Sequence, residues 1–201
     1  GASATDACSD VIWINDFVAL SNDCGATGSA TVMFTATDEC GNATSTVATF
    51  AIEDTVAPEV SDAMDVTFEC DGQGNVSDLD SWLTSNGGAE ASDACGGVTW
   101  THDFDMLVAS CGATGSSLVN FTATNACGNA IITSATFTTE DTLAPEFTTL
   151  PEDQVNQCEE TPYTAVAMDA CSDVVIMEER VVVSDDEYGN YEHLVTLTAT
   201  D

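Results

Sequence analysis

The sequence predicts an all-β protein made of tandem antiparallel β-sandwich modules that are stapled by disulfides, with one short helix in the complete module. Three observations lead to this prediction. The chain repeats itself at a fixed spacing, its apolar residues alternate with polar ones in short runs, and it contains nine cysteines in 201 residues.

Two long stretches of the sequence recur at an offset of 87 residues. DACSDVIWINDF (6–17) returns as DACGGVTWTHDF (93–104). CGATGSATVMFTATDECGNA (24–43) returns as CGATGSSLVNFTATNACGNA (111–130). A third, degenerate copy contains DACSDVVIM (169–177), at an offset of 76 from the second. Such self-similarity is typical of tandem-module proteins.

The repeat also predicts the domain boundaries. We expect 1–57 to be the C-terminal part of one module, 58–144 to be a complete module, and 145–201 to be the N-terminal part of a further, degenerate module. The chain then resembles a window on a longer array.

The local pattern inside the modules predicts half-buried antiparallel strands. VTFEC (66–70), VMFTA (32–36) and VNFTA (119–123) each place alternate apolar residues on one face. Trp13 and Trp100 hold equivalent positions, and we expect both to lie against the core. Short strands separated by turn residues, in modules of about 87 residues, favour an immunoglobulin-like sandwich.

One segment, SDLDSWLTSNGG (77–88), breaks this alternation. Ser77 is placed to cap a helix, an apolar trio follows at helical spacing (Leu79, Trp82 and Leu83), and Gly-Gly ends the pattern. We therefore expect a short helix or helical loop that covers one end of the sandwich.

The charge balance limits the possible partners. The chain has 35 acidic residues against a single Lys or Arg, and its formal net charge is −34. Nucleic acids and anionic membrane surfaces both require basic patches, so neither is expected as a partner. The apolar content of 44% is too high for a disordered acidic tail. No apolar run approaches the roughly 20 residues of a membrane span, so membrane insertion is not expected.

The cysteines indicate an oxidising location. The sequence has no C-x-x-C pair, which favours disulfides over metal-binding or free thiols. The third copy has lost the counterpart of Cys111, and the simplest pairing consistent with this loss joins first to second and third to fourth cysteine. The predicted bonds are Cys70–Cys95, Cys111–Cys127, Cys24–Cys40 and Cys158–Cys171, with Cys8 left over.

Acidic residues gather at the module boundaries. Seven fall in 53–71 and seven in 140–160, whereas 106–139 contains none. Two unit charges about 4 Å apart interact by about 4 kcal/mol at an effective dielectric near 20, so a cluster without a base would strain a folded junction. Coordination of Ca²⁺, which takes about six to eight oxygen ligands, would relieve this repulsion. The alternative is that the carboxylates point apart into water, as in salt-adapted proteins.

The motif EDTxAPE marks both boundaries, at 53–59 and 140–146. We expect its acids to face back across the boundary and to share Ca²⁺ with the neighbouring DAC loop. The candidate ligands are Glu53, Asp54, Glu59, Asp62, Asp93, Glu140, Asp141, Glu146, Asp169, Asp173, Asp6 and Asp10.

At this point the residues support a family resemblance. TATDECGNAT followed by TFAIEDTVAPE resembles the tandem hyalin-repeat-like, immunoglobulin-like modules of long bacterial surface and secreted proteins, as does SWLTSNGG before DACGG. The resemblance covers essentially the whole chain and implies an extracellular array for adhesion, spacing or fibre building. Related modules bind calcium at junctions and near a D-x-x-G-N turn, which implies Asp38 as a further ligand; the second copy has Asn125 there.

No catalytic residue is predicted, because neither His102 nor His193 recurs in the other copies. The sequence therefore predicts a structural, non-catalytic extracellular segment, secreted or on a cell surface. Its partners would be calcium ions and other copies of itself, in a calcium-stiffened rod or fibre. Two alternatives remain: an adhesin module that binds a glycan or host protein, and an accessory region of a large secreted enzyme.

Overall fold

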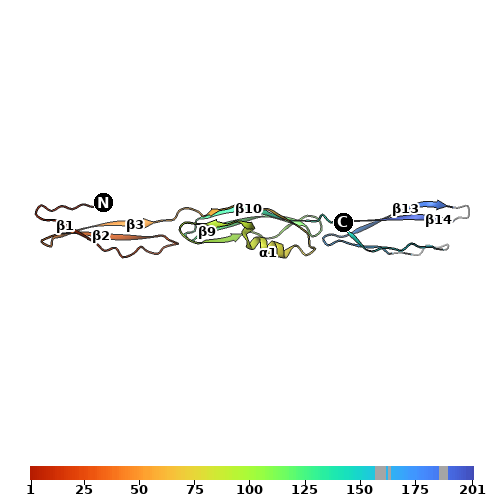
Figure 1. Cartoon of the computed structure of the whole chain (residues 1–201), viewed down its shortest axis with the longest axis horizontal. Helices are drawn as coiled ribbons and strands as arrows, with labels where there is room; N and C mark the ends of the chain where they lie inside the picture. Colours follow the sequence, from red (N-terminus) through yellow and green to blue (C-terminus); the bar gives the residue numbers. More distant parts are fainter. Residues whose placement is uncertain (157–161, 163, 186–189) are drawn as a thin grey trace. The chain divides into compact units, whose positions relative to one another are not determined.

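A computed structural model describes residues 1–156, 162, 164–185 and 190–201 of the chain. Within these residues the chain is mostly β-strand, with one α-helix and one 3-10 turn (Figure 1). The strands pair mainly antiparallel, so the predicted all-β class is confirmed. No helix among the described residues is long and apolar enough to cross a membrane.

The chain folds into two compact units, and each unit combines segments of more than one sequence copy. The first unit comprises Gly1–Ala63, Gly88–Asp103 and Asn120–Ser134. The second comprises Met64–Gly87, Phe104–Val119 and Ala135–Asp201. Strands β9 (Gly115–Asn125) and β10 (Ala130–Glu140) contribute residues to both units. The module boundaries expected at 57/58 and 144/145 stay a prediction.

The first unit contains a three-stranded antiparallel sheet and the ends of a larger one. The sheet has the order β1-β2-β3, with β1 at Val11–Asn15, β2 at Gly28–Asp38 and β3 at Ala43–Ile52. The first unit also contains the short pair of β4 (Glu59–Val60) and β6 (Ala91–Ser92). In the larger sheet, β7 (Val98–His102) pairs with the C-terminal half of β9.

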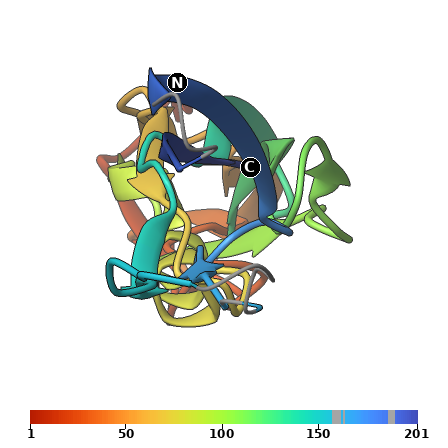
Figure 2. The same cartoon turned by 90° about the vertical axis from the view of Figure 1, so that its right-hand side faces the viewer.

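The second unit begins with β5 (Val66–Glu69), which pairs parallel to β10. β8 (Val108–Ala109) pairs with the start of β9. Two further antiparallel pairs complete the unit: β11 (Glu146–Thr149) with β12 (Val166–Met168), and β13 (Val175–Asp185) with β14 (Tyr191–Thr200). Figure 2 shows the β13–β14 hairpin as a curved blue ribbon, which reflects the twist usual for two-stranded ribbons.

The same strand pairing recurs in the three sequence copies. β1 pairs with β2, β7 with β9, and β13 with β14 in one common register. The equivalent partners are Ile12↔Thr37, Thr99↔Thr124 and Val175↔Thr200. Sequence offsets of 87 and 76 residues therefore also describe equivalent positions in the fold.

The core follows the predicted alternation. Val119, Phe121 and Ala123 of β9 are fully buried, as are Ala135 and Phe137 of β10. Polar residues between them face outward or reach hydrogen-bond partners. The period-two pattern therefore predicted the buried face of these strands correctly.

The predicted helical segment is confirmed, but its cap is not. Helix α1 spans Val76–Thr84 and is followed by the 3-10 turn η1 at Asn86–Gly88. The N-cap position belongs to Asn75, not to Ser77, which lies inside the first turn. Asn75 has a left-handed backbone (φ 50°), and its side chain donates to the carbonyl of Glu69 instead of capping the helix. This bond ties the start of α1 to the end of β5.

Helix α1 covers β10 through one aromatic side chain. The Trp82 ring centroid lies 5.5 Å from that of Phe137. The ring of Phe68, from β5, also lies 5.5 Å from the Phe137 ring. The Trp82 indole nitrogen donates to the carbonyl of Met64 at 3.1 Å, which satisfies its polar edge.

The expectation that both tryptophans lie against the core is wrong for Trp13. Trp100 is half-buried, whereas Trp13 is 38% exposed. The whole of β3 is also exposed, including Phe50 at 59%, although its counterpart Phe137 is 0% exposed. The physical reason is that β3 lies at the edge of its described sheet, without a β5–α1 cover of the kind that buries Phe137.

This contrast gives a matched pair of substitutions. Phe137→Ala should lower the free energy of unfolding by about 3–5 kcal/mol, because it empties a fully packed site. Phe50→Ala at the equivalent, exposed position should change it by about 0.5 kcal/mol or less. Urea unfolding followed by tryptophan fluorescence measures both. Equal losses would mean that Phe50 is packed like Phe137.

Candidate functional site

Two disulfides connect one sequence copy to the next. Cys24 bonds to Cys127 and Cys70 bonds to Cys171, with Cα–Cα distances of 5.1 and 6.0 Å. Each bond closes a loop of about one repeat, with sequence separations of 103 and 101. Each bond also lies within one compact unit.

The prediction of disulfides is confirmed, but all four predicted pairings are wrong. Cys24 and Cys127 bond to each other, and Cys70 bonds to Cys171, so none has its predicted partner. Free thiols remain at Cys8, Cys40, Cys95 and Cys111. Cys158 lies outside the described residues. The overturned bonds are Cys70–Cys95, Cys111–Cys127, Cys24–Cys40 and Cys158–Cys171.

Strand length explains the error. Cys24 precedes β2 and Cys40 follows it, so a strand of 11 residues separates them. At about 3.3 Å per residue this strand is about 36 Å long, whereas disulfide-bonded Cα atoms are about 4.4–6.8 Å apart. The same argument applies to Cys111 and Cys127, which flank β9.

Backbone contacts repeat beside both disulfides. The amide of Ala26 donates to the carbonyl of Cys95 at 2.6 Å, and the amide of Ala113 donates to the carbonyl of Cys171 at 2.7 Å. Gly25 and Gly112 have left-handed backbones (φ +54° and +52°), and a Cβ on either would overlap the same carbonyls. Each CGATG loop therefore docks on the DAC loop of the following copy, and glycine permits the close approach.

The aspartate of each DAC motif fixes the shape of that loop. An Asp93 side-chain oxygen accepts the amide of Cys95 at 2.9 Å, and Asp169 accepts the amide of Cys171 at 2.7 Å. Asp6 does the same for Cys8 at 2.8 Å. These Asx turns position the cysteine and leave the second carboxylate oxygen free for other contacts.

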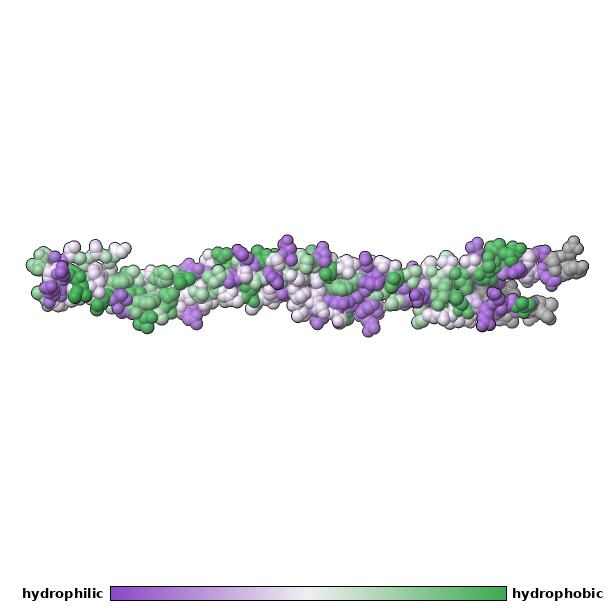
Figure 3. Space-filling view, in the orientation of Figure 1, coloured by the Kyte–Doolittle hydropathy of each residue, from purple (hydrophilic) through white to green (hydrophobic). Residues whose placement is uncertain are grey.

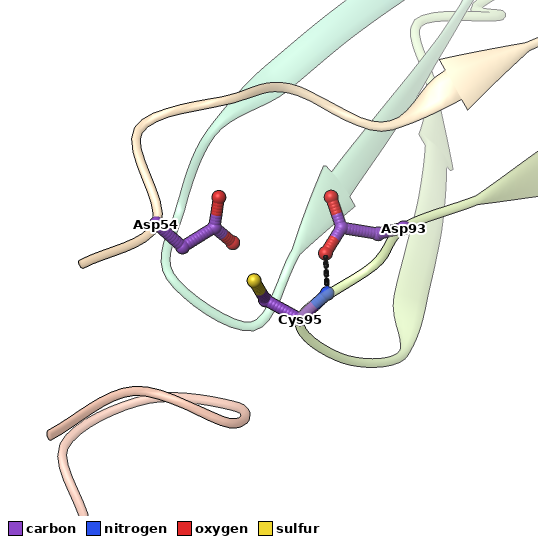
Figure 4. A group of neighbouring side chains, drawn as sticks. All are labelled: Asp54, Asp93 and Cys95. Atoms are coloured by element: carbon purple, nitrogen blue, oxygen red, sulfur yellow. Dashed lines mark hydrogen bonds between the residues drawn. The ribbon is translucent and has the colours of Figure 1, made fainter. Parts of the chain in front are cut away.

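Beside the first docked loop, two carboxylates converge. Ligand atoms of Asp54, Asp93 and Cys95 all lie within 4.8 Å of one another. Figure 4 shows the two carboxylates facing each other with the Cys95 sulfur between them. Burial, with Asp54 and Asp93 nearby, raises the pKa of the Cys95 thiol, so this sulfur stays protonated near neutral pH.

Asn125 neutralises part of this repulsion. Its side-chain amide donates to Asp54 at 2.8 Å and to Asp93 at 3.2 Å, and it also reaches the carbonyl of Val56 at 3.0 Å. Its carbonyl oxygen accepts two backbone amides of the following turn. Asn125 is only 5% exposed, and its hydrogen-bonding groups all have partners.

The equivalent cluster in the second unit has more charge. Asp141, Asp169 and Cys171 lie within the same 4.8 Å limit, but the Cys171 sulfur is in a disulfide. Asp201 occupies the position of Asn125. The Ser172 hydroxyl has carboxylate oxygens of Asp201 at 3.2 Å and Asp141 at 3.4 Å as alternative acceptors for its one hydrogen. Burial, the Asp169 charge and the Asp201 charge together raise the pKa of the Asp141 carboxyl.

The structure thus brings together four of the predicted calcium ligands in two equivalent pairs, Asp54 with Asp93 and Asp141 with Asp169. The other predicted ligands lie outside both clusters; these are Glu53, Glu59, Asp62, Glu140, Glu146, Asp173, Asp6, Asp10 and Asp38. Asp38 accepts the backbone and side-chain amides of Asn42, which lowers the pKa of its carboxyl. Its role as a ligand stays a prediction.

Sequence reasoning missed that the strand-end turn belongs to the same cluster as the boundary acids. The signal is present in the aligned runs FTATD, FTATN and LTATD, which end at Asp38, Asn125 and Asp201. Only the fold places this turn beside the EDT segment.

Comparison with known proteins adds no family: no family model and no curated protein matches the chain.

The pairing predicts a clear pattern of cysteine substitutions. Cys24→Ser, Cys127→Ser and the double variant should each lower the free energy of unfolding of the first unit by a similar amount, about 2–5 kcal/mol, because each removes the same bond. Chemical denaturation measures this loss.

The matched control is Cys40→Ser, which removes an exposed free thiol and should change the stability by about 0.5 kcal/mol or less. A Cys40→Ser loss as large as that of Cys24→Ser would restore the Cys24–Cys40 pairing.

Proposed function

We propose that this chain is a structural, non-catalytic segment of an extracellular array of repeats, in which each repeat is covalently fastened to the next. The observation that supports it most directly is the position of the two disulfides, since each connects a cysteine of one copy to a cysteine of the following copy. Bonds of this kind hold neighbouring repeats together under tension, as a mechanical element requires.

The disulfides limit how far the chain can be extended. Each one encloses about 100 residues in a closed loop, so tension applied along the chain bypasses that loop through the sulfur–sulfur bond. Each bond also stabilises its unit by roughly 2–4 kcal/mol. The docked CGATG loop adds a second, non-covalent connection at the same place.

Calcium would complete the second cluster. Asp141, Asp169 and Asp201 offer carboxylate oxygens, the ligands that Ca²⁺ prefers, and the structure describes no base within this cluster. The first cluster differs because the Asn125 amide already lies between its two carboxylates. We therefore propose Ca²⁺ binding chiefly at the second cluster, where it stiffens the connection between repeats.

The proposed location is outside the cell, in an array of the hyalin-repeat-like, immunoglobulin-like kind. Disulfides form in oxidising compartments, and a net charge of −34 suits a surface that repels other polyanions. The histidines support a structural role, because His102 packs edge-on to Phe121 and His193 lies 4.8 Å from the Tyr191 ring. The proposed partners are calcium ions and further copies of the repeat.

If calcium stiffens the connection, small-angle scattering should report a larger and better-defined radius of gyration in millimolar Ca²⁺ than after chelation. Mg²⁺ at the same ionic strength serves as the control, because it fits less readily into all-protein oxygen cages. Identical scattering curves in Ca²⁺ and in chelator would contradict the stiffening role.

The two clusters should respond differently to loss of one carboxylate. Asp141→Asn should reduce the gain in thermal stability that millimolar Ca²⁺ gives, because it removes a ligand from the three-carboxylate cluster. Asp54→Asn at the equivalent position should change this gain less, since Asn125 already offsets the charge there. Melting curves with and without Ca²⁺ compare the two variants. An Asp141→Asn variant that melts at a higher temperature in Ca²⁺ than the unchanged chain would refute calcium binding at the second cluster.

A further inference from the structure

Strand β3 offers an exposed apolar face and an open edge. Phe50 and Ile52 are 59% and 38% exposed, and β3 lies at the edge of the described β1-β2-β3 sheet. Apolar side chains over β2 and β3 appear as a green area in Figure 3. Exposed apolar area on a strand edge favours pairing with another strand.

The second unit shows what covers the equivalent face. There the segment 64–87, which we call the repeat head, adds β5 beside β10 and places α1 over Phe137. β5 runs parallel to β10 with Phe137 opposite Val66 and Glu140 opposite Glu69. The amide of Thr136 donates to Asp65 at 2.7 Å, and the amide of Cys70 donates to Glu140 at 2.8 Å.

β3 carries almost the same receiving sequence as β10. ATFAIEDT (48–55) aligns with ATFTTEDT (135–142), so Phe50 corresponds to Phe137 and Glu53 to Glu140. The contacts that hold the repeat head on β10 use backbone groups, the Phe137 ring and the Thr142 hydroxyl. The first copy has Phe50 and Thr55 at the equivalent positions. A repeat head therefore fits β3 in the same parallel register.

The thiol of Cys95 stands where the strand of that repeat head would end. On β10 the head's strand β5 is followed directly by Cys70, which bonds to Cys171 of the DAC loop, and Gly72 lies against the carbonyl of Ala170. Cys95 and Ala94 are the counterparts of Cys171 and Ala170. Cys95 is half-buried and unpaired, on a DAC loop that is docked in the same way as that of Cys171.

We propose that β3 binds a second copy of the repeat head as an added parallel strand, and that the cysteine of that head forms a disulfide with Cys95. This inference rests on the proposed function and names its partner. The occupant carries counterparts of Phe68 and Trp82, whose rings would cover Phe50, and a cysteine in the position of Cys70.

The bond forms by thiol–disulfide exchange. The cysteine of the repeat head first exists as a mixed disulfide with a small thiol. The Cys95 sulfur attacks the head's sulfur, the new S–S bond forms, and the small thiol leaves with the electron pair and takes up the proton from Cys95. The oxidising equivalent comes from the disulfide oxidant that made the mixed disulfide.

The same rule accounts for the other free thiols. Cys111 corresponds to Cys24, so its partner would be a cysteine in the Cys127 position of a further copy. Cys40 corresponds to Cys127 and Cys8 to Cys171, so each would bond to a preceding copy. Two bonds would then fasten every pair of consecutive repeats.

A synthetic peptide of residues 64–87 tests the proposal directly. Its cysteine carries an aryl thiol as a mixed disulfide, and the folded chain is mixed with it in chelator. Docking raises the effective concentration of the peptide cysteine, so Cys95 should be labelled at least about tenfold faster than by a scrambled peptide. Release of the coloured aryl thiol gives the rate. Mass spectrometry after digestion at Asp and Glu gives the site, because acidic residues separate the four free cysteines from one another.

Three variants make the result specific. Phe50→Asp should reduce the rate to that of the scrambled peptide while leaving the Cys24–Cys127 bond intact, which reports correct folding. Val47→Ser, on the opposite face of β3, should react like the unchanged chain, since the equivalent residue of β10 is Ser134. Cys95→Ser should abolish the fast labelling.

A rate advantage over the scrambled peptide that is as large at Cys8, Cys40 or Cys111 as at Cys95 would overturn the proposal, and so would a Phe50→Asp variant that keeps the advantage at Cys95. A rate no higher than that of the scrambled peptide would also overturn it. Because the reaction runs without Ca²⁺, its failure would leave the scattering test of the calcium-stiffened array unaffected.

Discussion

The distance between the two ends of a long β-strand determines how this chain is held together. Cys24 and Cys40 flank a strand of 11 residues, about 36 Å long, and so do Cys111 and Cys127. A disulfide needs Cα atoms about 4.4–6.8 Å apart, so these cysteines are out of reach of each other. Cys24 and Cys127 therefore bond between copies, and the docked loops and clustered carboxylates lie beside such bonds.

Each junction combines a rigid and an adjustable part. The disulfide and the docked CGATG loop depend on covalent bonds and on glycine backbones with no room for a side chain. The carboxylate cluster depends on one residue at the end of a strand, which is Asn125 in one unit and Asp201 in the other. This amide-to-carboxylate difference makes the second cluster more negative than the first, so the two clusters can differ in their need for a cation.

Local sequence patterns predicted the strands well and the long-range contacts poorly. The alternation around Val119, Phe121 and Phe137 indicates which face is buried, because it depends only on the two-residue period of a strand. The partner of Cys24 lies 103 residues away, and no local pattern encodes that distance. Asp54 and Asp93 were expected at the boundary, but the Asn125 amide between them became visible only when the fold brought the turn to the same place.

The central claim is that consecutive repeats are connected covalently, and a disulfide map of the unreduced chain tests it most directly. Free thiols are first blocked by alkylation at acidic pH, which suppresses exchange, and the protein is then digested and analysed without reduction. The account predicts cross-linked peptides that contain Cys24 with Cys127 and Cys70 with Cys171. Peptides that join Cys24 to Cys40 or Cys70 to Cys95 would place the bonds inside single repeats and contradict it.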